Sequence, residues 1–175
     1  MPTTRDFRTL TQFTQEAVDI SGKNVGTRVY WKLYVIENLY RIIIHSILSS
    51  QLSHLGPNWW HFVANTSIQN DVKRFKKGYL SKPWHTTPGS HDIYYVHLYG
   101  LNEIVRANSH LFSPVIQDID QWIVKIESIR LPRNVVAHMN FPNNTDRQRI
   151  NVLYEDLRKL TEFIQSETKV VLQIP

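Results

Sequence analysis

The chain of 175 residues contains no cysteine, few turn-forming residues and no long apolar run. Without cysteine it can form neither disulfides nor zinc sites built on thiolates, and this composition fits a cytoplasmic protein. Six glycines and eight prolines are too few for a turn-rich β protein. No stretch approaches the ~18 uninterrupted apolar residues of a membrane helix, and residues 1–8 lack the apolar centre of a secretory signal. These absences predict a helical cytoplasmic protein with no membrane segment.

The remaining composition fits a single globular domain. Apolar residues make up 42% of the chain and charged residues 20%, which is ordinary for a folded protein in water. A chain of this length can bury most of the surface that its unfolded form exposes. We therefore predict one domain over residues 1–175, with an N-terminal helix and loop at 1–25 and a C-terminal tail at 166–175.

Apolar residues recur three and four positions apart along much of the chain, which is the pattern of amphipathic helices. The clearest case runs from residue 29 to residue 47 and is expected to end by Gly56-Pro57. The other expected helices are at 5–20, 66–78, 94–112, 113–131 (with a kink at Leu131-Pro132) and 145–164, with loops at 21–26 and 81–92. Residues 66–69 and 145–148 have the form of capping boxes. The sequence predicts an all-α, up-and-down bundle of four long helices plus short helices.

The segment Arg133-Asn134-Val135-Val136-Ala137-His138 combines two side chains suited to phosphate chemistry. Arginine can hold a phosphate with a fork of donors, and the ordinary pKa of histidine (~6.5) lets it accept and donate protons near neutrality. Five steps along a helix place the two side chains ~140° apart around its axis. Such a pair serves one reaction best where the helix borders a cleft or faces a second copy of itself.

This R-N-x-x-x-H pattern resembles the signature of the HEPN superfamily (higher eukaryotes and prokaryotes nucleotide-binding domains), which includes many metal-independent endoribonucleases. Asn134 occupies the position after the arginine that the family favours. Gly56-Pro57-Asn58-Trp59-Trp60, which follows a long amphipathic helix, is similar to the HEPN variety attached to a nuclear RNA-surveillance endonuclease and to its free-standing prokaryotic relatives. The similarity covers roughly residues 26–165.

The resemblance implies a HEPN-like helical bundle that cleaves RNA by transesterification, with no cofactor and no metal. The ribose 2′-hydroxyl would attack the adjacent phosphorus and leave a 2′,3′-cyclic phosphate and a 5′-hydroxyl. His138 is then the candidate for proton transfer, Arg133 for charge stabilisation and Asn134 for orienting one of them. Two motifs meet across a dimer interface in HEPN nucleases, so a homodimer is expected. Translation shut-off, phage defence and RNA processing are the expected settings, with a cognate antitoxin or regulatory protein as a further partner.

A structural interpretation of the same residues stays open. In it Arg133 pairs with a buried carboxylate, His138 bonds a backbone carbonyl, and the chain is a non-catalytic module that binds RNA, nucleotide or a protein. Asn140 bears on the partner. HEPN toxins paired with a nucleotidyltransferase antitoxin commonly carry at this position a tyrosine that receives nucleotide, so neutralisation by that route is not expected here.

Glu37, Arg41 and His45 lie at successive i, i+4 positions on one face of the second helix. We favour an exposed ladder of charges. The alternative places this row opposite the motif, with Glu37 holding Arg133 or Arg41 in position. Glu37, Arg41 and Asn140 are therefore the candidates for residues that support the motif.

The net charge of +5 is unevenly distributed. One basic group comprises Lys73, Arg74, Lys76, Lys77 and Lys82, and another, on the last helix, comprises Arg147, Arg149, Arg158 and Lys159. Basic surfaces attract phosphate backbones through counterion release. Lys73, Arg74, Lys76 and Lys77 are thus candidates for RNA binding, and a solvated helix face is the alternative.

Two further groups of residues are interpreted structurally. The spacings of His85, His91, Asp92 and His97 fit no zinc pattern, so no metal site is predicted. Trp59 and Trp60 are expected to be core anchors rather than base-stacking platforms.

Overall fold

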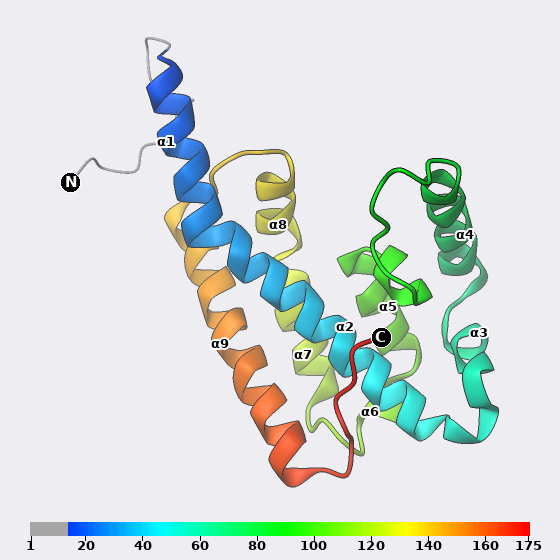
Figure 1. Ribbon diagram of the computed structural model, residues 1–175. Coiled ribbons are helices and arrows are strands. Elements are labelled where there is room, and N and C mark those ends of the chain that lie inside the picture. The colour runs from blue at the N-terminus through cyan, green and yellow to red at the C-terminus, as the bar shows by residue number, and fades with distance from the viewer. Residues whose placement is uncertain (1–13) are drawn as a thin grey trace.

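The computed structural model describes residues 14–175, and every regular element in this range is helical (Figure 1). The longer helices are α1 (Gln15–Val25), α2 (Trp31–Gln51), α4 (Thr66–Leu80), α5 (Leu98–Ala107), α7 (Ile119–Ser128), α8 (Arg130–Ala137) and α9 (Asn144–Glu167). The shorter elements are the π turn η2 (Gly26–Tyr30), the 3-10 turns η3 (Ser53–Trp59) and η4 (Asp92–Tyr95), α3 (Trp60–Val63) and α6 (Ser109–Phe112). No strand occurs between residues 14 and 175, so the predicted all-α class is confirmed.

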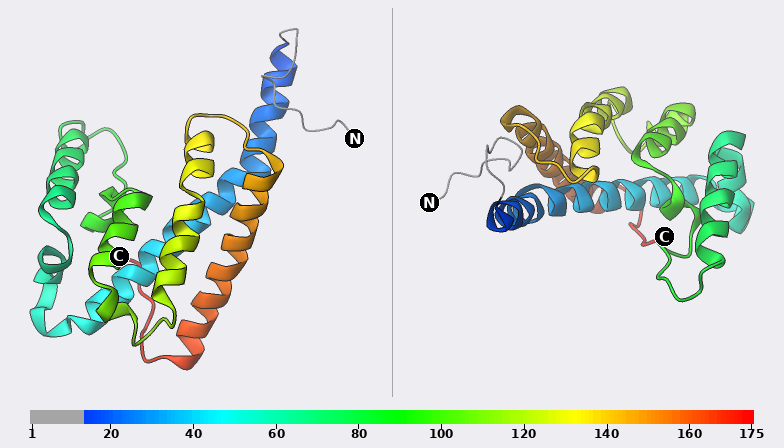
Figure 2. Two further views of the ribbon diagram at one scale, coloured as in Figure 1. Left: turned by 180° about the vertical axis from the view of Figure 1, so that it is seen from behind. Right: turned by 90° about the horizontal axis from the view of Figure 1, so that it is seen from above.

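Helix α2 is the central element of the fold (Figures 1 and 2). It runs diagonally across the molecule, α9 packs along it, and α5 and α6 pack against its second half. Helix α7 contacts both α5 and α9, and α8 follows α7 toward the beginning of α2. Helices α3 and α4 lie at the other end. The fold therefore separates α8 from α4 by much of the length of α2.

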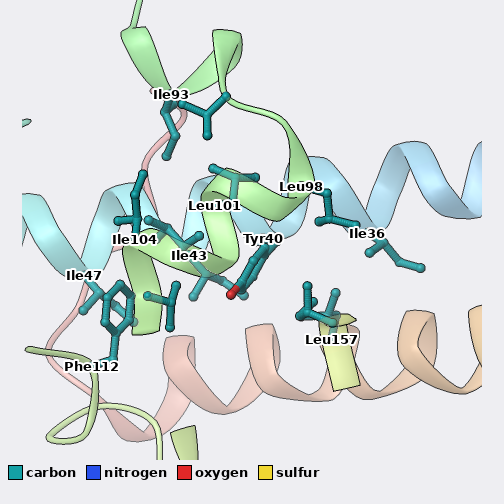
Figure 3. Close-up of a cluster of buried hydrophobic side chains, with 14 of the residues drawn as sticks. Ile36, Tyr40, Ile43, Ile47, Ile93, Leu98, Leu101, Ile104, Phe112 and Leu157 are labelled. Carbon is teal, nitrogen blue, oxygen red and sulfur yellow. The ribbon is translucent and has the colours of Figure 1, made fainter. Parts of the chain in front are cut away.

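The core forms where the apolar face of α2 meets the helices around it (Figure 3). The buried side chains of this cluster include Ile36, Tyr40, Ile43, Ile47, Leu101, Ile104, Phe112 and Leu157. Each large apolar side chain removed from water contributes roughly 1.5–3 kcal/mol to folding. The three- and four-residue spacing of the α2 members explains why this helix is buried along one side and why it was recognisable from the sequence.

Two polar side chains inside this core, those of Tyr40 and Asn102, are hydrogen-bonded. The Tyr40 hydroxyl donates to Asn102 Oδ1 at 3.0 Å, and Asn102 Nδ2 donates to the Ile123 carbonyl at 3.1 Å. Burial raises the pKa of Tyr40 well above its ordinary value, so the phenol stays neutral and keeps its donor. This chain of bonds links α2, α5 and α7.

The N-terminal half departs from the sequence prediction in its first loop. Residues 5–13 of the helix expected at 5–20 lie outside the described range. The loop expected at 21–26 is wrong, because α1 continues through these residues and joins α2 by η2. A glycine inside a helix costs roughly 1 kcal/mol but does not forbid the conformation. The Gly26 N–H donates to the carbonyls of Gly22 and Lys23, so the backbone stays bonded through both glycines.

Of the next two boundaries, the end of α2 falls before Gly56-Pro57 as predicted, and the start of α4 differs from the prediction. Helix α2 ends at Gln51, and the chain turns through η3, where Gly56 adopts φ 58°. The capping box expected at 66–69 is wrong, because the cap of α4 is Asn65, whose Oδ1 accepts from the Ile68 N–H at 2.9 Å. Gln69 instead donates to the carbonyls of His61 and Ala64.

Asparagine side chains also place two helix boundaries of the C-terminal half at positions other than those predicted. The helix expected at 94–112 is interrupted at Asn108, whose Nδ2 donates to the carbonyls of Ile104 (2.8 Å) and Val63 (3.1 Å). The capping box expected at 145–148 is wrong too, since Asn143 caps α9 by accepting from the Asp146 N–H at 2.9 Å.

The segment before the motif begins later and breaks earlier than expected. Helix α7 starts at Ile119 rather than at 113, after Asp118 in the left-handed region (φ 54°). The break expected at Leu131-Pro132 is present at Ile129, slightly before it. Pro132 lies in the first turn of α8, where its missing N–H is not needed.

A tail without regular structure follows α9, which ends at Glu167, two residues into the range predicted for the tail. Val170 is buried, and the Gln173 N–H donates to Ser46 Oγ at 2.8 Å, which ties the tail to α2. Among the helices between residues 14 and 175, none is long and apolar enough to cross a membrane.

Candidate functional site

A cleft of about 880 Å³ lies between α2, α8 and the connection that precedes η4, and we call it the α2–α8 cleft. Its α2 wall carries Tyr30, Tyr34, Glu37 and Arg41, and its α8 wall carries Arg133, Val136, Ala137 and Met139. Ile174 and Pro175 of the tail also line it. The motif arginine therefore faces the row of α2 residues that the sequence suggested as its support.

Glu37 is the centre of the polar wall. Its Oε1 accepts from Arg133 Nε at 2.7 Å, and its Oε2 accepts from Arg41 Nη2 at 3.1 Å. The side chains of Glu37 and Arg41 are 14% and 12% exposed, whereas Arg133 is 29% exposed. The carboxylate thus orients both guanidinium groups, and Arg133 is the one that reaches toward solvent.

This arrangement leaves an excess of positive charge on the wall, because two guanidinium groups share one carboxylate. Arg41 Nη2 also donates to the Val96 carbonyl at 3.3 Å. Arg41 Nε is buried, and no acceptor reaches it within residues 14–175. A buried donor without an acceptor is costly. An anion entering the cleft would meet an attractive field in surroundings where charges are weakly screened.

His138 lies at the C-terminal end of α8 with an exposed side chain. The backbone N–H of His138 donates to the Asn134 carbonyl at 3.0 Å, and the next residue, Met139, adopts φ 59°. Ala137 and Met139 line the α2–α8 cleft, but His138 does not. The ~140° separation expected around the helix accounts for this: Arg133 points into the cleft and His138 points to solvent near its rim.

The two asparagines of the motif region behave differently. Asn140 Nδ2 donates to the His138 carbonyl at 3.1 Å and closes the end of α8. The Asn134 side chain is exposed, and its amide has no hydrogen-bond partner within residues 14–175. The contact by which Asn134 was expected to orient Arg133 or His138 is thus not made within one chain.

The exposed ladder favoured for Glu37, Arg41 and His45 is wrong. Glu37 and Arg41 are largely buried at the cleft, and His45 packs among aromatic rings. The ring of His91 stacks on Trp59, with the centroids 5.4 Å apart, and lies 4.8 Å from that of His45. Glu37 contacts Arg133 of α8 and His45 contacts His91, and the spacing alone could not reveal either contact.

The two clustered histidines are held in their neutral form. Burial lowers the pKa of His45. Burial also lowers the pKa of His91 to about 4, with further lowering by His45 and Lys76 and an opposing effect of Asp92. Trp59 and Trp60 are buried in the same cluster, which confirms them as core anchors.

The basic run of α4 is not brought to the motif. Arg74 pairs with Asp71 and Lys76 pairs with Asp92, while Lys73 and Lys77 are exposed. Helix α4 lies at the opposite end of α2 from α8 in every view (Figures 1 and 2). An RNA-binding role of this run would therefore need a strand that extends across the molecule.

The histidines around the 81–92 loop are dispersed. His85 lies beside Trp84, His97 packs on Phe75, and His91 belongs to the tryptophan cluster. Residues 14–175 bring together no group of three or more His, Asp or Glu side chains that could hold a metal ion.

Sequence reasoning missed the tyrosines of the α2–α8 cleft. Tyr30 and Tyr34 are exposed, and Tyr94 lines the cleft from η4. A signal was available, because Tyr30, Tyr34, Glu37 and Arg41 follow one another at intervals of four, three and four and so share one face of α2. The tail residues could not have been found this way, since they reach the cleft only through folding.

Comparisons with known proteins find no match to the chain among protein-family profiles, curated proteins or solved structures. The resemblance to HEPN domains therefore depends on the sequence alone, on residues 133–138 and 56–60.

Proposed function

We propose that this chain is a HEPN-type endoribonuclease that cleaves RNA without a metal ion. The observation that supports the proposal is the position of Arg133. It lies partly exposed on the wall of a cleft of about 880 Å³, it is oriented by Glu37, and it belongs to a motif that ends in an exposed histidine.

The proposed reaction requires proton transfer and charge stabilisation. His138 takes the proton of the ribose 2′-hydroxyl and the oxygen attacks phosphorus. The bond to the 5′ oxygen breaks as that oxygen takes a proton from water. Such proton transfer contributes roughly 10²–10⁴-fold. Arg133 bonds Glu37 through Nε, so both of its terminal nitrogens can donate to the phosphoryl oxygens. Tyr30 and Tyr34 offer exposed rings on which bases can stack.

A homodimer completes this proposal. Within one chain Arg133 and His138 point in different directions, so one chain does not direct both groups at one phosphate. Leu131, seven residues before His138 and so on the same side of α8, is 65% exposed, and Met139 at the edge of the cleft is 83% exposed. A second copy packed against this side would bring His138 of one protomer toward the cleft of the other.

The first test is cleavage of single-stranded RNA in EDTA. His138→Ala is expected to lower the rate by about 10²-fold or more, with unchanged circular dichroism because the side chain is exposed. His110→Ala, another exposed histidine, is the matched control and is expected to retain full activity. Equal activity of His138→Ala and the unmodified protein would eliminate the catalytic assignment.

A mixing experiment tests the shared site. If each site takes Arg133 from one protomer and His138 from the other, a mixture of Arg133→Ala and His138→Ala proteins regains activity. Random exchange gives half heterodimers with one intact site of two, hence up to about one quarter of the original activity. A mixture as inactive as its components would exclude a composite site.

Two observations favour a second candidate, a non-catalytic HEPN module that binds RNA, nucleotide or a protein. Arg133 makes the ion pair expected of a structural arginine, and the Asn134 side chain supports neither motif partner within one chain. This candidate predicts RNA binding without cleavage in the EDTA assay.

A further inference from the structure

A second cleft, of about 340 Å³, lies between the beginnings of α2 and α9, and we call it the α2–α9 cleft. Arg28 and Lys32 line it from the α2 side, and Arg147 lines it from α9. Tyr30 and Tyr34, by contrast, line the α2–α8 cleft. The two clefts thus lie on different sides of the same helical segment.

The lining of the α2–α9 cleft is cationic, and among residues 14–175 it includes no acidic side chain. The nearest acid in the first turn of α9, Asp146, is paired with Arg149 at 3.0 Å. The remaining polar lining consists of amides and a hydroxyl, among them Asn144 and Asn151. Lys32 and Arg147 are two positive side chains on one small cavity and repel one another, so an anion there would be stabilising.

Two of the cations are fixed in place by neutral partners. Lys32 Nζ donates to Asn151 Oδ1 at 2.6 Å, and it lies 5.4 Å from the ring centroid of Trp31. Arg147 Nη2 donates to Asn144 Oδ1 at 3.3 Å, and its guanidinium lies 4.8 Å from the ring centroid of Phe141. Neither contact neutralises a charge. Uncharged groups therefore hold both Lys32 and Arg147 in place.

Arg147 gives a second, independent indication. Its Nε is buried and has no acceptor within residues 14–175. The positive end of the α9 dipole lies at the same place, because Asn144 and Arg147 belong to the first turn of this long helix. A ligand oxygen in the cleft would supply an acceptor to the side chains and would be favoured by the dipole.

We infer that the α2–α9 cleft is a phosphate-binding site, and that the phosphate belongs to single-stranded RNA. The choice of RNA rests on the proposed function, whereas the phosphate chemistry rests on the cleft itself. The site would hold one phosphate away from the scissile position. One bound RNA strand would then contact two anion sites that border α2, one at Arg133 of α8 and one at Arg147 of α9.

Binding of a non-cleavable strand tests this inference apart from catalysis. The probe is a fluorescent, single-stranded 2′-O-methyl RNA of roughly twelve nucleotides, measured by anisotropy with the full chain. Lys32→Gln with Arg147→Gln is expected to weaken binding about tenfold or more. The slope of log K against log salt should also become shallower by about 0.7 for each phosphate that the variant no longer neutralises.

The matched control removes the same charge from elsewhere on α9. Arg158→Gln with Lys159→Gln is expected to change affinity less than about threefold, because these residues lie outside the cleft. Arg147→Lys, which keeps the charge but loses the guanidinium fork, should bind with intermediate affinity. Thermal melting checks that each variant is folded.

Each outcome of this experiment decides the inference. Equal losses of affinity in the cleft and control variants would reduce the cleft to unspecific basic surface and overturn it. Inorganic pyrophosphate is the second probe, measured by calorimetry. If pyrophosphate binding needs Lys32 and Arg147 but RNA binding does not, the phosphate belongs to a small molecule and the RNA assignment is wrong. None of these results depends on cleavage, so the nuclease proposal is judged separately by His138→Ala.

Discussion

Replacing Glu37 by glutamine removes the carboxylate that two guanidinium groups share while keeping the shape of the side chain. Glu37 and Arg41 are 14% and 12% exposed and Arg133 is 29% exposed, so the cluster is buried on one side and reaches water on the other. Deleting one partner of a fully buried pair costs about 3–5 kcal/mol, and an exposed pair contributes about 0–1 kcal/mol. The partial exposure of Arg133 places the cost of Glu37→Gln between these limits, at about 2–3 kcal/mol.

Urea denaturation followed by circular dichroism measures this loss directly. The matched control is Glu103→Gln, which breaks a pair with Arg106 on α5 that is more exposed (30% and 53%) and should cost less than about 1 kcal/mol. A third variant adds Arg41→Met to Glu37→Gln, and it should recover part of the stability because it removes an uncompensated buried cation. Equal losses for Glu37→Gln and Glu103→Gln would refute the argument that this carboxylate neutralises a buried cluster.

Two further variants test other parts of the structure. Burial lowers the pKa of His91 from its ordinary value of 6.5 to about 4. Between pH 6.5 and pH 4 the unfolded chain therefore binds more protons than the folded chain. The free energy of unfolding falls as the pH falls through this window. The side chain in His91→Asn can still accept from the Ile93 N–H. After allowance for solvent screening, this variant should remove on the order of 1 kcal/mol of the fall in unfolding free energy between pH 7 and 5, measured by urea titration. An unchanged fall would contradict the role of His91 in this pH dependence. Gly56→Ala should cost about 1–3 kcal/mol because Gly56 adopts φ 58°, whereas Gly78→Ala, inside α4 with open space around it, should stabilise by roughly 0.5–1 kcal/mol. Equal effects of the two glycine changes on thermal unfolding would contradict the backbone argument.

Helix positions were predictable where one apolar face dominated. Helix α2 and helix α9 follow their apolar spacing closely, because burial of that face decides both the element and its orientation. The boundaries were less predictable, because asparagines at 65, 108 and 143 compete for backbone groups through their side chains. The glycines at 22 and 26 suggested a loop, yet the backbone bonds of α1 and η2 continue through them.

The candidate site was likewise predictable from the sequence only in part. The spacing of Arg133 and His138 predicted that the two side chains diverge; in the structure Arg133 lines the α2–α8 cleft and His138 does not. The spacing of Glu37 and Arg41 showed that they share one face of α2, but not whether that face is buried. Contact with α8 decides this, because it brings Arg133 within hydrogen-bond distance of Glu37 across 96 residues of chain.

The sequence by itself determined the helical class, the amphipathic path of α2 and the relative directions of Arg133 and His138, because these follow from local periodicity. Tertiary structure alone decided which charges share a cleft. Residues distant along the chain meet only when the core closes, so Arg133 joins Glu37 and Arg147 joins Lys32 through packing that no local pattern encodes.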